Sequence, residues 1–173
     1  MQAETRVMRL VDPILMEMDQ EAEITKRLFD IIPEDKLSWR PHPKAKSLGE
    51  LAMHIAWLQG AVAELTQPET VEIPDFPPDP EAKSRKEIFE AFTQSLKKAK
   101  EIVGSMDDAQ VMAEYTITKD GKTLMAAPRI SFWRSILLNH NYHHRGQLST
   151  YLRTLDVPLP SIYGPSADTN PFN

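Results

Sequence analysis

The sequence of 173 residues contains no cysteine. This absence excludes a disulfide framework, a cysteine-ligated zinc site and a thiol nucleophile supplied by the chain itself. No apolar run approaches the roughly 20 residues that a membrane-spanning helix needs. Basic residues are also in deficit, since 20 Lys plus Arg stand against 25 Asp plus Glu, for a net charge of −5. A nucleic-acid-binding surface is usually basic, so this balance argues against a nucleic-acid partner.

What remains has an ordinary globular composition, with 41% hydrophobic and 26% charged residues. The length suits one domain with a hydrophobic core, and we predict a single domain over residues 1–173. Residues 1–6 lack the basic and then apolar pattern of a secretory signal. We therefore expect a soluble cytoplasmic protein that acts neither on nucleic acid nor at a membrane.

Four segments have the apolar periodicity of helices. Pro33 ends the first, and a Ser47–Glu50 capping box begins the second. Gly104 suits the C-terminal cap of the third. The four segments are residues 13–32, the helix whose apolar face runs from Leu48 to Leu65, residues 81–104 and residues 128–155.

The connections between these segments have their own patterns. Residues 68–80 hold five prolines, which predicts an extended connection, without a domain boundary, that crosses one end of a helix bundle. Residues 115–124 predict a β-hairpin with its tight turn at Asp120-Gly121. From Val157 the chain looks irregular. The fold class that follows is all-α: a bundle of four antiparallel helices with a small β-hairpin before the last helix.

His140 and His144 are spaced by four residues in the last predicted helix. A helix turns once in about 3.6 residues, so both imidazoles face the same way and could hold one metal ion. Both fall in the apolar stripe, where a histidine must satisfy its ring nitrogens away from water. Chance places two of five histidines four apart in about one chain of this length in seven, so spacing alone leaves a buried structural histidine as the alternative.

His54 is the candidate third ligand. On a helical wheel it lies about 60° from Leu51, at the edge of the apolar face of the second helix. Three histidines leave an open coordination position, which is typical of catalytic metal sites. Imidazole ligands suit zinc, nickel, iron or copper; we predict zinc or nickel, with iron or manganese as alternatives. His143 points sideways of the pair and belongs to the site's surroundings, its rim or the surface, and His42 is expected to be a solvated loop residue.

Four motifs occur in order along the chain: Trp39-Arg40-Pro41, Ser47–Leu51 followed by His54, His140–Leu148 followed by Tyr151-Leu152-Arg153, and the tail Pro158–Gly164. Together they resemble the motifs of the DinB/YfiT-like family. The resemblance implies a four-helix bundle of up-down-down-up type, a divalent metal held by His54, His140 and His144, and a homodimer. It spans most of the chain in the family's order.

Members of the wider family resemble thiol-dependent transferases or isomerases that use small thiols such as bacillithiol or mycothiol, and others resemble hydrolases. We predict a metal-dependent transferase or hydrolase acting on a small molecule, with no catalytic residue assigned. Because the chain has no cysteine, any thiol must arrive with a low-molecular-weight cosubstrate. Two alternatives stay open: a non-catalytic metal-binding or stress-response protein, and a bundle with incidental histidines that associates through its helix faces.

Several other residues have two interpretations. Arg145 and Arg153 could hold an anionic substrate, but we interpret them as solvated charges. Glu50 could orient a ligand or serve as a base, but we interpret it as part of the helix cap. The scattered methionines are interpreted as core filler and not as a partner groove: Met8, Met16, Met18, Met53 and Met125.

Overall fold

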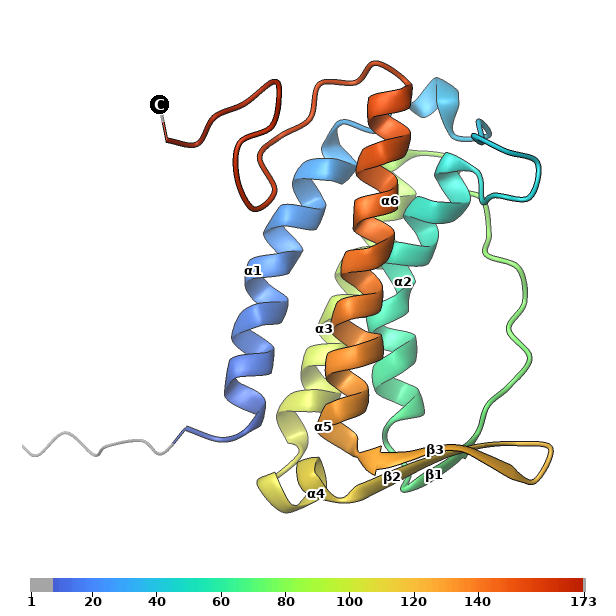
Figure 1. The fold of residues 1–173 in the computed structure, drawn as a ribbon, viewed down its shortest axis with the longest axis vertical. Helices are drawn as coiled ribbons and strands as arrows, with labels where there is room; N and C mark the ends of the chain where they lie inside the picture. Colours follow the sequence, from blue (N-terminus) through green and yellow to red (C-terminus); the bar gives the residue numbers. More distant parts are fainter. Residues whose placement is uncertain (1–7, 173) are drawn as a thin grey trace, which may run out of the picture.

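The structure is a computed structural model that describes residues 8–172. The predicted all-α bundle with a small sheet is confirmed (Figure 1). Residues 1–6, which lack a secretory signal pattern in the sequence, lie outside the described residues, and so does Asn173. The limits of the single domain therefore stay a prediction. The four long helical elements are α1 (Val11–Asp30), α2 (Leu48–Leu65), α3 (Arg85–Ser105) and α6 (His140–Thr154).

The direction of the helices follows the up-down-down-up order that the family resemblance implies. Helices α1 and α6 run one way, whereas α2 and α3 run the other way (Figure 1). The antiparallel arrangement expected from the four helices alone is therefore wrong for the pair α2 and α3. These two helices can be parallel because the long connection between them returns along the whole bundle before α3 begins.

That connection is extended, as predicted, but its expected path across one end of the bundle is wrong. After α2 it forms strand β1 (Thr70–Glu72), and residues 73–80, here called the strap, then run along the side of α2 (Figure 1). Strand β1 lies at the edge of a three-stranded sheet and pairs in parallel with β2 (Glu114–Lys119). Prolines are tolerated beside an edge strand, which explains how the segment enters the sheet.

The predicted hairpin is confirmed as β2 and β3 (Lys122–Pro128). Asp120 and Gly121 have φ values of 50° and 72°, the left-handed conformations that a two-residue turn of this type requires. Gly104 is not the cap of α3; it lies inside the helix, which extends through Ser105. Two short helical elements lie in the connections: a 3-10 turn (Glu34–Lys36) between α1 and α2, and α4 (Asp108–Met112) between α3 and β2.

The predicted helix over residues 128–155 is one continuous helical run of three parts. It begins as α5 (Arg129–Phe132), continues as a π-helical segment (Trp133–Asn139) and ends as α6. A π-helix has a wider turn than an α-helix, so one helical wheel does not describe the whole run. Residues 140–144 lie within α6, where the regular spacing of four holds.

The core forms two hydrophobic clusters along the bundle. Trp133 and Tyr115 are buried in one, and Phe29 packs edge-to-face on Phe92 in the other, with ring centroids 5.4 Å apart. Among the methionines, Met18 and Met53 are buried, as predicted for core filler. The same prediction is wrong for three that are exposed: Met8, Met16 and Met125. Of the helices in residues 8–172, none is both long and apolar enough to cross a bilayer.

Candidate metal centre

The structure brings together the three histidines that the sequence predicts as ligands. His54 comes from α2, and His140 and His144 come from α6; one ring nitrogen of each lies within 4.8 Å of the others. The Nε2 atoms of His140 and His144 are 2.6 Å apart, and the ring centroids of His54 and His144 are 4.4 Å apart. All three side chains are half-buried. The arrangement places three imidazole donors around one point.

Local structure positions His54 on α2. Ser47 Oγ accepts a hydrogen bond from Glu50 N (3.1 Å), and Ser47 N donates to Glu50 Oε2 (2.6 Å). This predicted capping box is confirmed, and it sets the start of the helix less than two turns before His54. The buried side chain of Asn141 donates to the carbonyl oxygen of Ile55 (3.4 Å), which links α2 to α6 beside the ligands.

Asp79, at the end of the strap, sets the orientation of His54. Its Oδ1 lies 2.9 Å from His54 Nδ1 and accepts a hydrogen bond from Trp57 Nε1 (3.0 Å), while Lys46 Nζ donates to Oδ2. Burial alone would raise the pKa of Asp79, but the hydrogen bonds from Lys46 and His54 outweigh it and hold the pKa below its usual value. An ionised carboxylate only accepts hydrogen bonds, so Nδ1 of His54 carries the hydrogen.

With Nδ1 held by Asp79, Nε2 is the ring nitrogen of His54 that is left for another partner. It is buried and has no hydrogen-bond partner among residues 8–172. A buried acceptor without a partner costs about 1–3 kcal/mol. A divalent metal ion satisfies such an atom, and a carboxylate on the opposite ring nitrogen is the usual second partner of a metal-ligating histidine. The residues present thus fit a metal ion.

The surroundings of His144 and His140 favour the neutral form of each imidazole, in which a ring nitrogen can bind a metal ion. The Nδ1 atom of His144 lies 2.8 Å from Gln147 Oε1, which leaves its Nε2 for an ion. Burial, assisted by the charges of the neighbouring histidines, lowers the pKa of His144 to about 4. Burial and the charges of His54, His143 and Lys46 lower the pKa of His140. Metals bind neutral imidazole, so these shifts favour the ligating form.

Four residues around the ligands were not predicted from the sequence: Lys46, Asp79, Asn141 and Gln147. The only signal for Asp79 is that a carboxylate stands between two prolines, Pro78 and Pro80. Because the strap lacks helical or strand periodicity, its sequence does not show that Asp79 contacts His54, which lies 25 positions earlier on a helix. Gln147 stands three residues after His144 and was within reach of the same helical reasoning.

The other candidates lie away from the centre. His143 is exposed at the rim, with its ring centroid 5.0 Å from that of His144, and His42 is an exposed loop residue. Arg153 is a surface residue that pairs with Asp168, in agreement with its interpretation as an exposed charge. Arg145 contradicts that interpretation and the substrate-binding one, because it is buried and forms an ion pair with Glu21 on α1.

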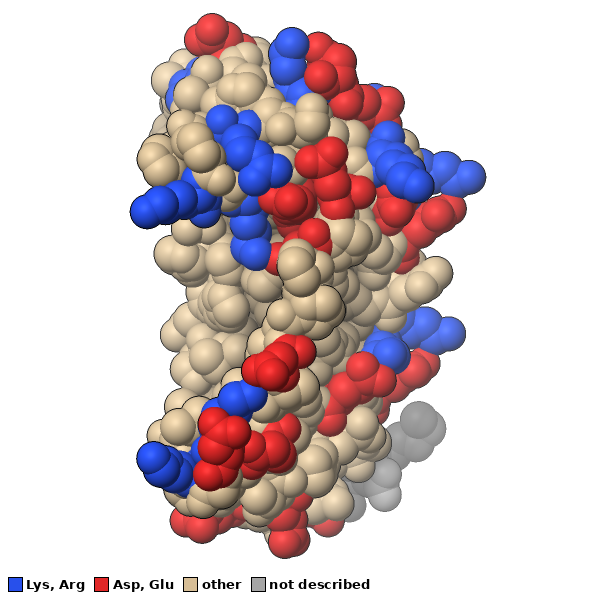
Figure 2. Space-filling view, turned by 90° about the vertical axis from the view of Figure 1, so that its right-hand side faces the viewer, with Lys and Arg blue, Asp and Glu red and all other residues tan. Residues whose placement is uncertain are grey.

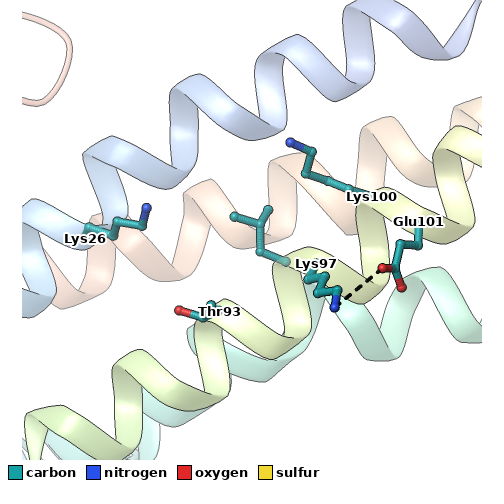
Figure 3. Close-up of a pocket in the computed structure, with 6 residues that line it drawn as sticks. Lys26, Thr93, Lys97, Lys100 and Glu101 are labelled. Carbon is teal, nitrogen blue, oxygen red and sulfur yellow. Dashed lines mark ion pairs between the residues drawn. The ribbon is translucent and has the colours of Figure 1, made fainter.

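A separate groove of about 480 Å³ lies between α1 and α3 (Figure 3). Its three lysines are paired with acidic residues: Lys97 with Glu101 (3.9 Å), Lys100 with Asp19 (2.5 Å) and Lys26 with Glu23 (2.7 Å). It is not lined by any of the three histidines. The candidate metal ligands among the described residues therefore lie between α2 and α6, apart from this groove.

Comparisons with known proteins agree with the fold. The chain is 24% identical over 164 residues to YrdA, an uncharacterized protein of Bacillus subtilis (strain 168), covering 91% of this chain and 90% of YrdA. Among solved structures, a DinB-like protein from Bacillus cereus ATCC 10987 has a TM-score of 0.68 at 22% identity, covering 86% of this chain and 95% of that one. The DinB-like protein YjoA from Bacillus subtilis has a TM-score of 0.66 at 18% identity, covering 87% and 97%.

The two solved structures share the fold, and the family assignment comes from the sequence itself. The model of the DinB superfamily matches residues 17–148, which include all three histidines of the centre. With this match, the ordered motifs and the helical bundle, the chain belongs to the DinB superfamily.

Proposed function

We propose that the protein is an enzyme that acts on a small molecule, and that it binds one divalent metal ion for this purpose through His54, His140 and His144. The observation that carries this proposal is the buried Nε2 of His54, which has no partner among residues 8–172 while Asp79 holds the opposite ring nitrogen. The all-nitrogen donor set suits zinc or nickel, with iron or manganese as alternatives.

The donor set supports catalysis better than a closed structural site. Among residues 8–172, the cluster able to hold an ion contains these three histidines and no carboxylate. Three protein ligands leave a coordination position at which a bound divalent ion can activate water or lower the pKa of a thiol. Asp79 orients His54 and is itself held by an ion pair with the half-exposed Lys46. The proposed reactions are thiol-dependent transfer and hydrolysis, with any thiol supplied by a cosubstrate.

Metal binding is tested on protein purified without a histidine tag and incubated with zinc or nickel. We expect about one ion per chain by elemental analysis, and loss of the ion in His54→Ala and His140→Ala. His143→Ala is the matched control, because this neighbouring histidine is exposed and should retain the ion. Absence of metal from the unsubstituted protein would contradict the proposal.

Enzyme activity is tested by incubating the metal-loaded protein with small thiols and electrophilic acceptors, and with ester and amide substrates. We expect thiol consumption or hydrolysis that disappears in His140→Ala and on treatment with a chelator. A metal-loaded protein that turns over none of these compounds faster than His140→Ala would favour the non-catalytic alternative.

We also propose a homodimer, with a cytoplasmic location as a further prediction. Two methionines at the start of the chain and on α1, Met8 and Met16, are 63% and 65% exposed, and burying them would favour association. Sedimentation velocity should show a dimer that Met16→Lys weakens, whereas Met112→Lys, at a 52% exposed methionine on α4, leaves it intact. A monomeric unsubstituted protein would contradict the proposal.

A further inference from the structure

An apolar hollow of about 640 Å³ lies between α2 and the strap. Its wall on α2 includes Met53, Trp57 and Ala61, and its wall on the strap includes Phe76, Pro77 and Pro78. Figure 2 looks at the side along which the strap runs and shows an uncharged band across the middle of this face, with charged side chains above and below it. Small-molecule sites typically have volumes of about 300–1,000 Å³ and mainly apolar walls.

The hollow and the metal centre share a wall. Asp79 lines the hollow, and its Oδ1 contacts both His54 Nδ1 and Trp57 Nε1. The rings of His54 and Trp57 pack edge-to-face with centroids 5.3 Å apart. Met53, another wall residue, directly precedes His54. None of the three histidines lines the hollow itself, so a molecule bound there is separated from His54 by one side chain, that of Asp79 or Trp57.

We propose that this hollow binds the hydrocarbon part of the substrate while a polar head on the same molecule reaches the metal centre. The substrate class is then a small amphiphile with a metal-binding or electrophilic head and an apolar tail. Phe76 is 54% exposed, so a tail in the hollow removes apolar surface of both partners from water. This inference rests on the proposed metal centre. It adds the feature by which the protein selects its substrate, which is an apolar tail.

The test uses straight-chain hydroxamates, from acetohydroxamate to octanohydroxamate, and the full-length zinc-loaded protein. All members share one metal-chelating head and differ only in the length of the tail. Burial of each added CH₂ should tighten binding about three- to fourfold, measured by isothermal titration calorimetry. A flat series in the unsubstituted protein would overturn the inference.

Two pairs of variants locate the tail. Ala61→Leu partly fills the hollow, and Ala91→Leu is its control, because Ala91 is a half-buried alanine of α3 that does not line the hollow. Phe76→Ala removes an exposed ring from the wall, and Phe172→Ala removes an 80% exposed ring elsewhere. We expect the gain per CH₂ to shrink in Ala61→Leu and Phe76→Ala and to persist in both controls.

The metal content of the same samples separates the two proposals. In one outcome, all five proteins contain the metal, bind acetohydroxamate normally and show the same gain per CH₂. This result would overturn the hollow as the tail site but would not contradict the metal centre. A chain-length gain of the same size after removal of the metal would show that the hollow binds apolar molecules independently of the centre. That result would overturn the link to the substrate. Failure to take up metal overturns both proposals.

Discussion

At the scale of single residues, the centre depends on how Asp79 holds His54. Asp79→Asn keeps the shape of the side chain but removes the charge that pairs with Lys46 and that holds the hydrogen on Nδ1 of His54. Loss of such a partner typically lowers metal affinity about 10- to 100-fold. We expect a drop of this size for zinc, measured by competition with a chelating dye.

The strap contains a matched control for this experiment. Asp75 is also a strap carboxylate, but its side chain is 98% exposed and pairs with Lys119 (2.7 Å). Asp75→Asn should leave zinc affinity unchanged. Equal losses in the two variants would mean that the strap acts through its overall charge and not through Asp79.

The pH dependence of the metal-free protein follows from His144. Its pKa of about 4 in the folded protein lies below the roughly 6.5 of an unfolded chain. Between these values the unfolded chain binds more protons, so the free energy of unfolding should fall as the pH falls from about 6.5 to 4. Urea denaturation across this range should show the decline, with a smaller slope in His144→Gln. The same slope in His144→Gln as in the unsubstituted protein would contradict this assignment, and His143→Gln serves as the control.

At the scale of secondary structure elements, two helical glycines should respond to alanine in opposite directions. A Cβ on Gly60 of α2 would lie 3.0 Å from Ser95 Oγ and 3.1 Å from Ser95 Cα on α3, so this glycine permits the close approach of the two helices. Gly60→Ala should destabilise the protein by roughly 1–3 kcal/mol through overpacking. A Cβ on Gly146 of α6 meets nothing within 4 Å.

Gly146→Ala should therefore stabilise the protein by roughly 0.5–1 kcal/mol, because alanine loses less backbone entropy in a helix. Urea denaturation of the two variants measures both effects. Destabilisation by Gly146→Ala would show that α6 needs backbone freedom beside the ligands, and a neutral Gly60→Ala would show that α2 and α3 can separate without cost.

At the scale of the whole molecule, a polar cluster built on a buried ion pair ties the tail to the bundle. Arg145 of α6 pairs with Glu21 of α1 at 2.5 Å, and the hydroxyl of Tyr163 in the tail contacts both. Burial, with the hydrogen bond to Glu21, raises the pKa of Tyr163 to about 12, so its hydroxyl remains a donor at neutral pH. The cluster joins segments 18 and 142 positions apart from Tyr163.

Arg145→Ala leaves Glu21 buried without its charge partner, a change that typically costs about 3–5 kcal/mol. We expect a loss of this size in the free energy of unfolding, measured by urea denaturation. Arg153→Ala, which removes an exposed ion pair from the same helix, should change stability little. Similar effects in the two variants would mean that the polar cluster does not hold the bundle together.

Local features of the molecule were predictable from the sequence. The start of α2 follows from the hydrogen bonds between Ser47 and Glu50, and the hairpin turn follows from the backbone freedom of Asp120-Gly121. Helical periodicity placed the buried faces, and the family motifs pointed to the three histidines. The cap, the turn and the helix faces depend on residues within a turn or two of one another, where geometry is set by the backbone itself. The set of three histidines came from the family resemblance, because His54 and His140 lie on different helices.

Only the tertiary structure decided what surrounds the histidines. The π-helical segment, the path of the strap, the contact of Asp79 with His54 and the burial of Arg145 against Glu21 all join parts of the chain that no local period relates. The sequence by itself determined the four helices and the cap of α2, because these depend on near neighbours, and its family motifs indicated the candidate ligands. Folding decided which nitrogen of His54 stays free and which apolar hollow lies beside it, because both depend on contacts between segments distant along the chain.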